Sequence, residues 1–237
     1  MKKLIVIICV LLVIFIGMVI YRKQEIQGKN INAEEVEQIQ SYISQVYMWK
    51  EVADEALPVF EDINNAPDKW VWEVVKNNLD EFQVTKEQIM EKAKEIFGTN
   101  FNKQFPDEGT ESLLYQSEIN KYIASETNLD NKEDSFLINT ITKTDGGYEV
   151  EIVEYLEDYS NVENLTEEEL QKSEEELNYA IYLENLNGER IAELNNNDGE
   201  TKVIETVKSN IDRFTKKTIT LEKVNGDKLI IKKCENR

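Results

Sequence analysis

The chain has 237 residues, with 27 basic and 47 acidic side chains and a formal net charge of −20 at pH 7. It contains no histidine, which excludes Ser-His-Asp and Cys-His catalysis and histidine-based zinc sites. So acidic a chain is expected to repel nucleic acid, and its charge is typical of a soluble surface domain.

A long apolar stretch lies at the N-terminus. Residues 4–21 carry no charged side chain, and as a helix they would span about 27 Å, close to the ~30 Å of a hydrocarbon core. A cleaved signal peptide has a shorter apolar core and a small-residue cleavage site, which the stretch from Ile16 to Ile20 lacks. A lipoprotein signal needs a small residue before its cysteine, but Ile8 precedes Cys9. We therefore predict an uncleaved transmembrane anchor that holds the chain in the lipid bilayer through residues 4–21.

The charges that flank this segment are nearly balanced, because two lysines precede it and Arg22 and Lys23 follow it. Large domains translocate largely regardless of charge. We therefore expect residues 1–3 to be a cytoplasmic stub and residues 22–32 a connector. Residues 33–237 then form a domain outside the cell membrane.

Three helices are predicted between residues 33 and 97. Asn32 can cap the first helix, which continues with apolar spacings of three and four to Leu57, and Pro58 ends or bends it. The second helix follows the turn at residues 64–68. One side of this second helix is predicted to carry Trp72, Val75, Leu79 and Phe82.

Two tryptophans of the second helix, Trp70 and Trp72, have two interpretations. An exposed pair could form a platform for a carbohydrate or a peptide. Aromatic side chains at helical spacing are more often part of the core, and that is our prediction.

The third helix has the clearest boundaries. Thr85 and Gln88 form a capping box, and Val84 and Ile89 can pack as a hydrophobic staple. Gly98 is predicted to end this helix as a left-handed C-cap.

Beyond residue 109 the apolar period changes from about four to two, which predicts β-strands. The predicted strands are residues 113–115, 121–123, 135–142, 148–155, 179–186, 189–194, 218–224 and 227–233. Glycine-containing turns at 144–147, 187–188 and 225–226 join the last six strands into three hairpins. On the strand at 148–155, one face is predicted to carry Tyr148, Val150, Ile152 and Glu154, and the other Val153 and Tyr155.

Two helices are predicted among the strands. Thr166 and Glu169 form a second capping box, and the helix that they start runs to about Leu177. The acidic run at residues 167–169 stabilises a helix N-terminus, and we prefer this interpretation to a metal site. The second inserted helix covers residues 203–214.

This order of elements predicts an α+β fold with helices packed on one face of an antiparallel sheet. We expect one domain at 33–237, with helices at 33–97 and a mainly antiparallel sheet with inserted helices at 112–237. The N-terminal helices and the closing hairpin at 218–233 resemble the helix-then-bent-sheet plan of cystatin-like and NTF2-like extracytoplasmic domains. The segment at 158–214 is longer than in a minimal version of that plan. This resemblance implies a similar architecture but does not imply a function.

A calcium loop is suggested by Asn196, Asp198, Gly199 and Glu205. With Gly199 at the sixth position of an EF-hand loop, Leu194 stands at the first, where an oxygen ligand is required. We therefore predict an ordinary turn at these residues and no metal site.

Glu151 and Glu154 are the first carboxylates to examine as an acid–base pair, although 47 acidic residues make any single pair uninformative. The two cysteines are expected not to pair, because Cys9 lies in the predicted anchor and Cys234 near the C-terminus. Cys234 is predicted to be a small core or edge residue. No catalytic residue and no cofactor is predicted.

Three functional hypotheses follow. The preferred hypothesis is a non-enzymatic, membrane-anchored extracytoplasmic domain that binds a protein or a component of the cell envelope. The first alternative is a carrier or sensor of small ligands with an apolar pocket. The second is a carboxylate-dependent hydrolase of envelope polymers.

Overall fold

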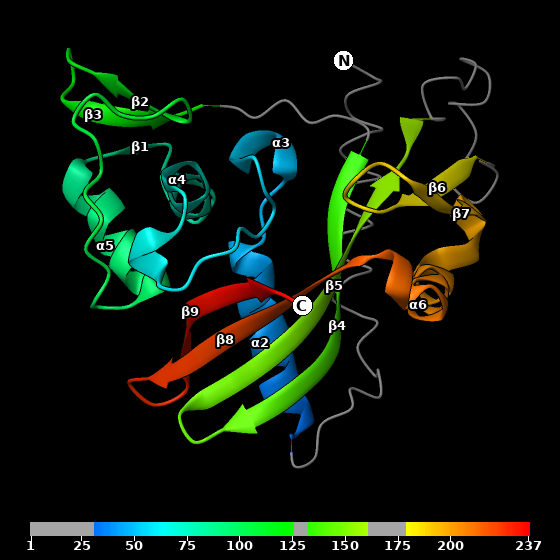
Figure 1. Ribbon diagram of the computed structural model, residues 1–237. Helices are drawn as coiled ribbons and strands as arrows, with labels where there is room; N and C mark the ends of the chain where they lie inside the picture. Colours follow the sequence, from blue (N-terminus) through cyan, green and yellow to red (C-terminus); the bar gives the residue numbers. More distant parts are fainter. Residues whose placement is uncertain (1–30, 126–131, 161–178) are drawn as a thin grey trace.

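The computed structural model describes residues 31–125, 132–160 and 179–237 (Figure 1). The predicted anchor at 4–21 and the predicted helix at 166–177 lie outside these ranges. Within them, no helix has both the length and the apolar character needed to cross a membrane. The described chain has helices and antiparallel sheets, which confirms the predicted α+β class.

The elements in chain order are as follows. The helices are α2 (Ala33–Val46), α3 (Lys50–Ala53), α4 (Asp68–Asn77), α5 (Lys86–Phe97) and α6 (Gly199–Ser209). The strands are β1 (Gln83–Val84), β2 (Leu113–Gln116), β3 (Lys121–Ala124), β4 (Lys132–Thr144), β5 (Gly147–Asp158), β6 (Ala180–Glu184), β7 (Arg190–Asn195), β8 (Thr215–Val224) and β9 (Lys228–Asn236). The three predicted hairpins at the C-terminal side are therefore confirmed.

A six-stranded antiparallel sheet is built on the long β4–β5 hairpin. On the side away from β4, residues 147–154 of β5 pair with β8 and residues 156–158 pair with β6. Strands β9 and β7 then extend the sheet beyond β8 and β6. The two ends of the long strand β5 thus pair with two smaller hairpins, β8–β9 and β6–β7.

Helices cover both faces of this sheet, so the prediction of one covered face was wrong. Helix α2 passes behind the sheet in Figure 1, and its buried side chains join those of Val150 and Ile152. Helix α6 lies on the other face, where Val203 and Val207 cluster with Val153. The cause is the composition of β5, whose apolar side chains alternate to both faces, so that each face needs a cover. The predicted division of β5 between two faces is confirmed.

The first predicted helix is interrupted, because α2 ends at Val46 rather than near Leu57. Asn32 does cap its start, in a capping box with Glu35. At its end, the carbonyl of Val46 accepts a hydrogen bond from Nε1 of Trp70. In the separate short helix α3, the backbone N–H of Lys50 donates a hydrogen bond to the carboxylate of Asp134, at 2.7 Å. Both partners come from distant parts of the chain.

The second predicted helix is shorter than expected, since α4 ends at Asn77. Phe82, predicted to lie on its core-facing side, instead leads into β1, and its carbonyl accepts the N–H of Ala124. Strand β1 joins β3 and β2 in a separate three-stranded sheet, order β1-β3-β2. The strand pattern predicts β2 and β3, but not β1 or the three-stranded sheet that β1 completes.

The capping-box prediction for α5 is correct. Gly98 ends the helix with a positive φ as predicted, but its ψ of 164° is extended rather than left-handed helical, and the predicted C-terminal boundary of α6 is wrong. Thr85 and Gln88 form the capping box of α5, and Gly98 follows that helix with φ +96°. Helix α6 begins at Gly199 and ends at Ser209, before the predicted limit at residue 214.

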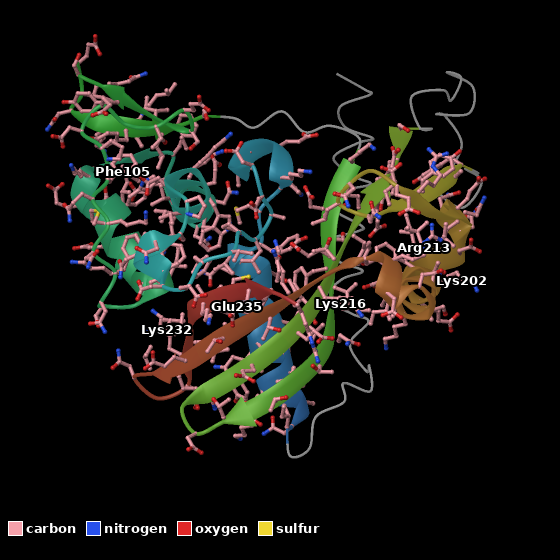
Figure 2. The ribbon with its side chains drawn as sticks, viewed as in Figure 1. Phe105, Lys202, Arg213, Lys216, Lys232 and Glu235 are labelled. Carbon is pink, nitrogen blue, oxygen red and sulfur yellow. The ribbon has the colours of Figure 1, made fainter. Side chains whose placement is uncertain are left out.

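An aromatic core joins α4 and α5 to the three-stranded sheet. Trp70 and Trp72 are both buried, which confirms the core prediction. The ring of Trp72 meets that of Phe105 edge-on, with centroids 5.1 Å apart, and Phe105 meets Tyr122 of β3 at 5.0 Å. Figure 2 labels Phe105 beneath the three-stranded sheet, where it connects this sheet to the helices.

Candidate functional site

The two carboxylates singled out from the sequence lie on opposite faces of β5. Glu151 contacts the side chain of Asn139 and forms an ion pair with Arg237. Glu154 faces the side of α2 and lies 3.0 Å from Nζ of Lys217. An odd spacing along a strand separates two side chains across the sheet, so this pair cannot act together on one glycosidic bond.

Glu154 and Lys217 form a buried ion pair. Nζ of Lys217 also donates to the backbone carbonyl of Leu57 and lies 3.8 Å from Glu55. Burial raises the pKa of Glu154, while the nearby Lys217 and the hydroxyl of Tyr47 lower it. The pair links β5 and β8 to the loop that precedes α4, which is a structural role.

A second group of carboxylates occupies the far end of the β4–β5 hairpin. Glu133 and Glu157 are direct cross-strand partners, and Glu157 accepts hydrogen bonds from Tyr159 at 2.6 Å and Ser135 at 3.3 Å. Oε2 of Glu133 is buried and has no hydrogen-bond partner among the described residues. Burial, together with the nearby charges of Glu157 and Asp134, raises the pKa of Glu133 from 4.5 to about 7.

Replacing Glu133 with glutamine is expected to remove a pH-dependent loss of stability. The folded chain holds this proton up to about pH 7, whereas the unfolded chain releases it near 4.5, so stability falls as pH rises between these values. Glu133→Gln should therefore be more stable than the parent above pH 7, by on the order of 2 kcal/mol after allowance for partial exposure.

Urea unfolding across this pH range measures the effect. The control is Glu193→Gln, at an exposed carboxylate of β7, which should keep the parent pH profile. If the free energies of unfolding of Glu133→Gln and the parent chain changed with pH in parallel, Glu133 would not have a raised pKa in the folded chain.

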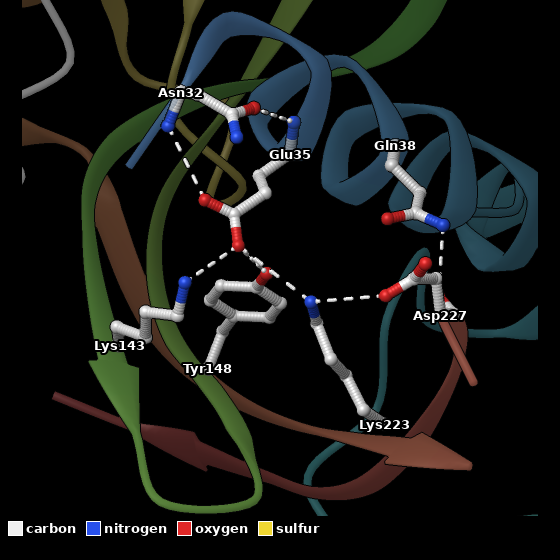
Figure 3. Close-up of polar contacts among 7 residues, drawn as sticks. All are labelled: Asn32, Glu35, Gln38, Lys143, Tyr148, Lys223 and Asp227. Carbon is white, nitrogen blue, oxygen red and sulfur yellow. Dashed lines mark hydrogen bonds and ion pairs between the residues drawn. The ribbon is translucent and has the colours of Figure 1, made fainter. Parts of the chain in front are cut away.

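A third polar cluster holds the first turn of α2 on the sheet (Figure 3). Oε1 of Glu35 accepts hydrogen bonds from Nζ of Lys143 and the hydroxyl of Tyr148, both at 2.7 Å, and lies 3.6 Å from Lys223. These contacts hold the pKa of Glu35 down at about 2, with Lys143 the largest cause. Since every member has partners inside the cluster, its role is to fix α2 to the ends of two hairpins.

An open depression lies between α2, α5 and β9. Its rim includes Gln38, Ser41 and Gln45 of α2, Glu95 of α5 and Lys228 of β9. Tyr42, Ile96 and Leu229 also line it, so polar and apolar side chains share the lining. The space between α2 and the sheet is filled by their own buried side chains.

The exposed apolar side chains gather on the three-stranded sheet. Phe82 is 58% exposed, Leu114 51%, Ile119 45% and Tyr115 40%. We call these four residues the small-sheet surface. In the described part of the chain, Val59 is the one other large apolar side chain with such exposure, at 44%.

The strand register explains this exposure. Leu114 pairs across β3 with Ile123, and Ile123 pairs with Gln83, so these three share the outer face. Tyr115, Tyr122 and Val84 form the next row, which faces the core, and Tyr115 lies at its open end. Ile119 sits in the turn between β2 and β3. Leu114 therefore lies on the outer face, Tyr115 at the end of the core-facing row and Ile119 in the turn. Phe82 lies beside Ala124, at the end of β3 opposite that turn.

The edge of β2 is covered by its own preceding loop. Thr110 exchanges hydrogen bonds with Leu113, and Gly109 forms a bridge to Leu114. Gly109 has φ +85°, and a Cβ there would lie 2.3 Å from the carbonyl oxygen of Leu113. A partner would accordingly meet the side chains of this sheet rather than add a strand to β2.

The other candidate residues have structural surroundings. Asn195, Asp198 and Gly199 form a short 3-10 turn in which Asp198 accepts the N–H of Asn195 at 2.7 Å, as the turn prediction expected. Cys234 is buried with its thiol free, which fits the predicted core position. Groups of acidic or cysteine side chains arranged to hold a metal are not found in the described ranges.

Sequence reasoning missed the small-sheet surface. The spacing of Phe82 predicts a helix face, and Leu113-Leu114-Tyr115 predicts a strand whose inner and outer sides the pattern does not distinguish. The available signal was three consecutive apolar residues in a short strand, which must place at least one side chain away from the core.

Comparisons with known proteins do not assign the chain to a family. No protein-family model matches the chain. Neither the curated proteins nor the solved structures contain a significant match.

Proposed function

We propose that the chain is a non-enzymatic binding domain that docks a polypeptide on the small-sheet surface. In this proposal, residues 4–21 anchor it in the cell membrane and residues 33–237 lie outside. The observation that carries the proposal is that four of the five exposed large apolar side chains in the described ranges lie on or beside one small sheet. Such groups of exposed apolar residues mark sites of protein–protein interaction.

Two features of the scaffold support a docking role. The three-stranded sheet rests on the aromatic core around Phe105, so its outer side chains are held by a rigid base. The β2–β3 hairpin also projects at the upper left of Figure 1, while α2 begins at the lower end of the molecule. The hairpin thus lies far from the start of α2.

The alternative functions find less support. Glu151 and Glu154 lie on opposite faces of β5, so the hydrolase hypothesis loses the pair that motivated it. The carrier hypothesis needs an enclosed apolar cavity, whereas the described depression beside α2 is open and has a mixed polar and apolar lining. These observations favour a surface function.

Site-specific photo-crosslinking tests the proposal in the full chain. A photoreactive amino acid replaces Leu114 in one variant and Val59 in a matched control, because their exposures are similar. In the cells from which the chain derives, we expect Leu114 to give a discrete adduct with one polypeptide. The Val59 position should not give that adduct.

Mass spectrometry of the crosslinked peptides identifies the contact. Adducts with lipid alone, or equal adducts from both positions, would contradict docking at the small-sheet surface.

A further inference from the structure

The charged residues around the small-sheet surface indicate which kind of partner it can bind. We propose that this surface binds a positively charged polypeptide segment that carries apolar side chains. This inference rests on the proposed function and adds the class of partner.

Most basic side chains near the three-stranded sheet are already neutralised by local partners. Lys86 pairs with Asp107, Lys103 with Asp68, and Nζ of Lys92 lies 3.4 Å from Asp80. Lys121 on β3 is the remaining basic residue of the sheet itself.

Four glutamates in the same region have no ion-pair partner within the described ranges. All four are exposed; they are Glu81, Glu108, Glu111 and Glu118. Glu81 precedes Phe82, and Glu118 precedes Ile119, so acidic side chains stand directly beside two members of the surface. The apolar surface is therefore bordered by uncompensated negative charge.

This arrangement favours one kind of occupant. Apolar side chains of a partner would cover Leu114 and Ile119, and basic side chains would meet the bordering glutamates. Acidic partners would be repelled, and a neutral apolar partner would leave those charges without partners. A second copy of this chain would bring the same acidic border against itself.

Peptide probes test this chemistry on the full chain in nanodiscs of zwitterionic lipid. The probe is a fluorescent peptide of alternating lysine and leucine, compared with a glutamate–leucine and a lysine–serine peptide. Fluorescence anisotropy should show that the lysine–leucine peptide binds at least about tenfold more tightly than either of the two comparison peptides.

Matched variants locate the binding site. Leu114→Ser and Ile119→Ser should each weaken binding of the lysine–leucine peptide by about tenfold. Val59→Ser, at the similarly exposed side chain outside this sheet, should leave the affinity unchanged. Circular dichroism of each variant confirms that the fold is retained, since all three positions are exposed.

The charge contribution has its own variant. Glu111→Gln with Glu118→Gln should weaken binding and flatten its dependence on salt, because fewer charges attract the peptide. Glu193→Gln on β7 is the control with no expected effect. Equal affinity for the lysine–leucine and glutamate–leucine peptides, or no effect of Leu114→Ser, would overturn the inference.

Two outcomes separate this inference from the proposed function. If Leu114 crosslinks to a polypeptide in cells but the probes show no preference for basic peptides, only the partner chemistry is wrong. If the chain self-associates and Leu114→Ser abolishes this self-association, the occupant is a second copy, and the inference also fails. Failure of the crosslinking itself removes the docking function.

Discussion

Replacement of Lys217 with methionine is expected to lower the free energy of unfolding by about 3–5 kcal/mol at neutral pH. The change leaves the carboxylate of Glu154 buried without its ion-pair partner, which lies 3.0 Å away in the parent chain. A buried unpaired carboxylate holds its proton more tightly in the folded state. The loss should therefore shrink as pH falls, and urea unfolding at several pH values measures it.

Two further variants separate charge burial from loss of packing. Lys216→Met is the matched control at the neighbouring residue, where the partner Asp212 is exposed, and it should cost at most about 1 kcal/mol. The double variant Glu154→Leu with Lys217→Met should recover most of the lost stability, because no buried charge remains. A double variant as unstable as Lys217→Met would show that the charge of Glu154 is not the cause.

Trp70→Ala is expected to destabilise the chain by about 3–5 kcal/mol through a large core cavity. The indole is fully buried and its ring lies 5.6 Å from that of Phe60 and 5.8 Å from that of Phe97. Its Nε1 also donates to the carbonyls of Val46 and Ala56, at 3.1 and 3.2 Å. Truncation would leave these two carbonyls without that donor. Thermal or urea unfolding followed by circular dichroism gives the size of the loss.

Phe82→Ala provides the contrast at an exposed aromatic residue. Because Phe82 is 58% exposed, its truncation should change stability by only about 0.5 kcal/mol. If Phe82→Ala proved as destabilising as Trp70→Ala, Phe82 would belong to the core and the small-sheet surface would be smaller than described.

Much of the fold was predictable from signals that act over a few residues. The N-cap at Asn32, the capping box at Thr85 and the glycine turns of the three hairpins depend on contacts between near neighbours in sequence, so they appear where the sequence places them. The alternation along β5 is likewise a local property of an extended backbone. The burial of Trp70 followed from its helical spacing.

The candidate site was less predictable, because its exposure depends on which segments pair. Strand β1 has only two residues, too few for a periodic pattern, and it exists because β3 is available to pair with it. That pairing places Phe82 outside the helix to which its spacing assigned it. The exposure of Leu114 depends equally on the outer face of this sheet remaining uncovered.

By itself the sequence determined the α+β class, most strand positions, the absence of histidine chemistry and the acidic character of the chain. The tertiary structure alone decided where α2 stops, that α6 covers the second face of the large sheet, and that Glu151 and Glu154 are separated. It also decided which apolar side chains remain at the surface. The physical reason is distance along the chain: the carbonyl of Val46 is bonded by a tryptophan 24 residues away, and Lys217 reaches the carbonyl of Leu57 across 160 residues. A local sequence pattern cannot predict hydrogen-bond partners that lie so far apart in the chain, so only the folded structure shows them.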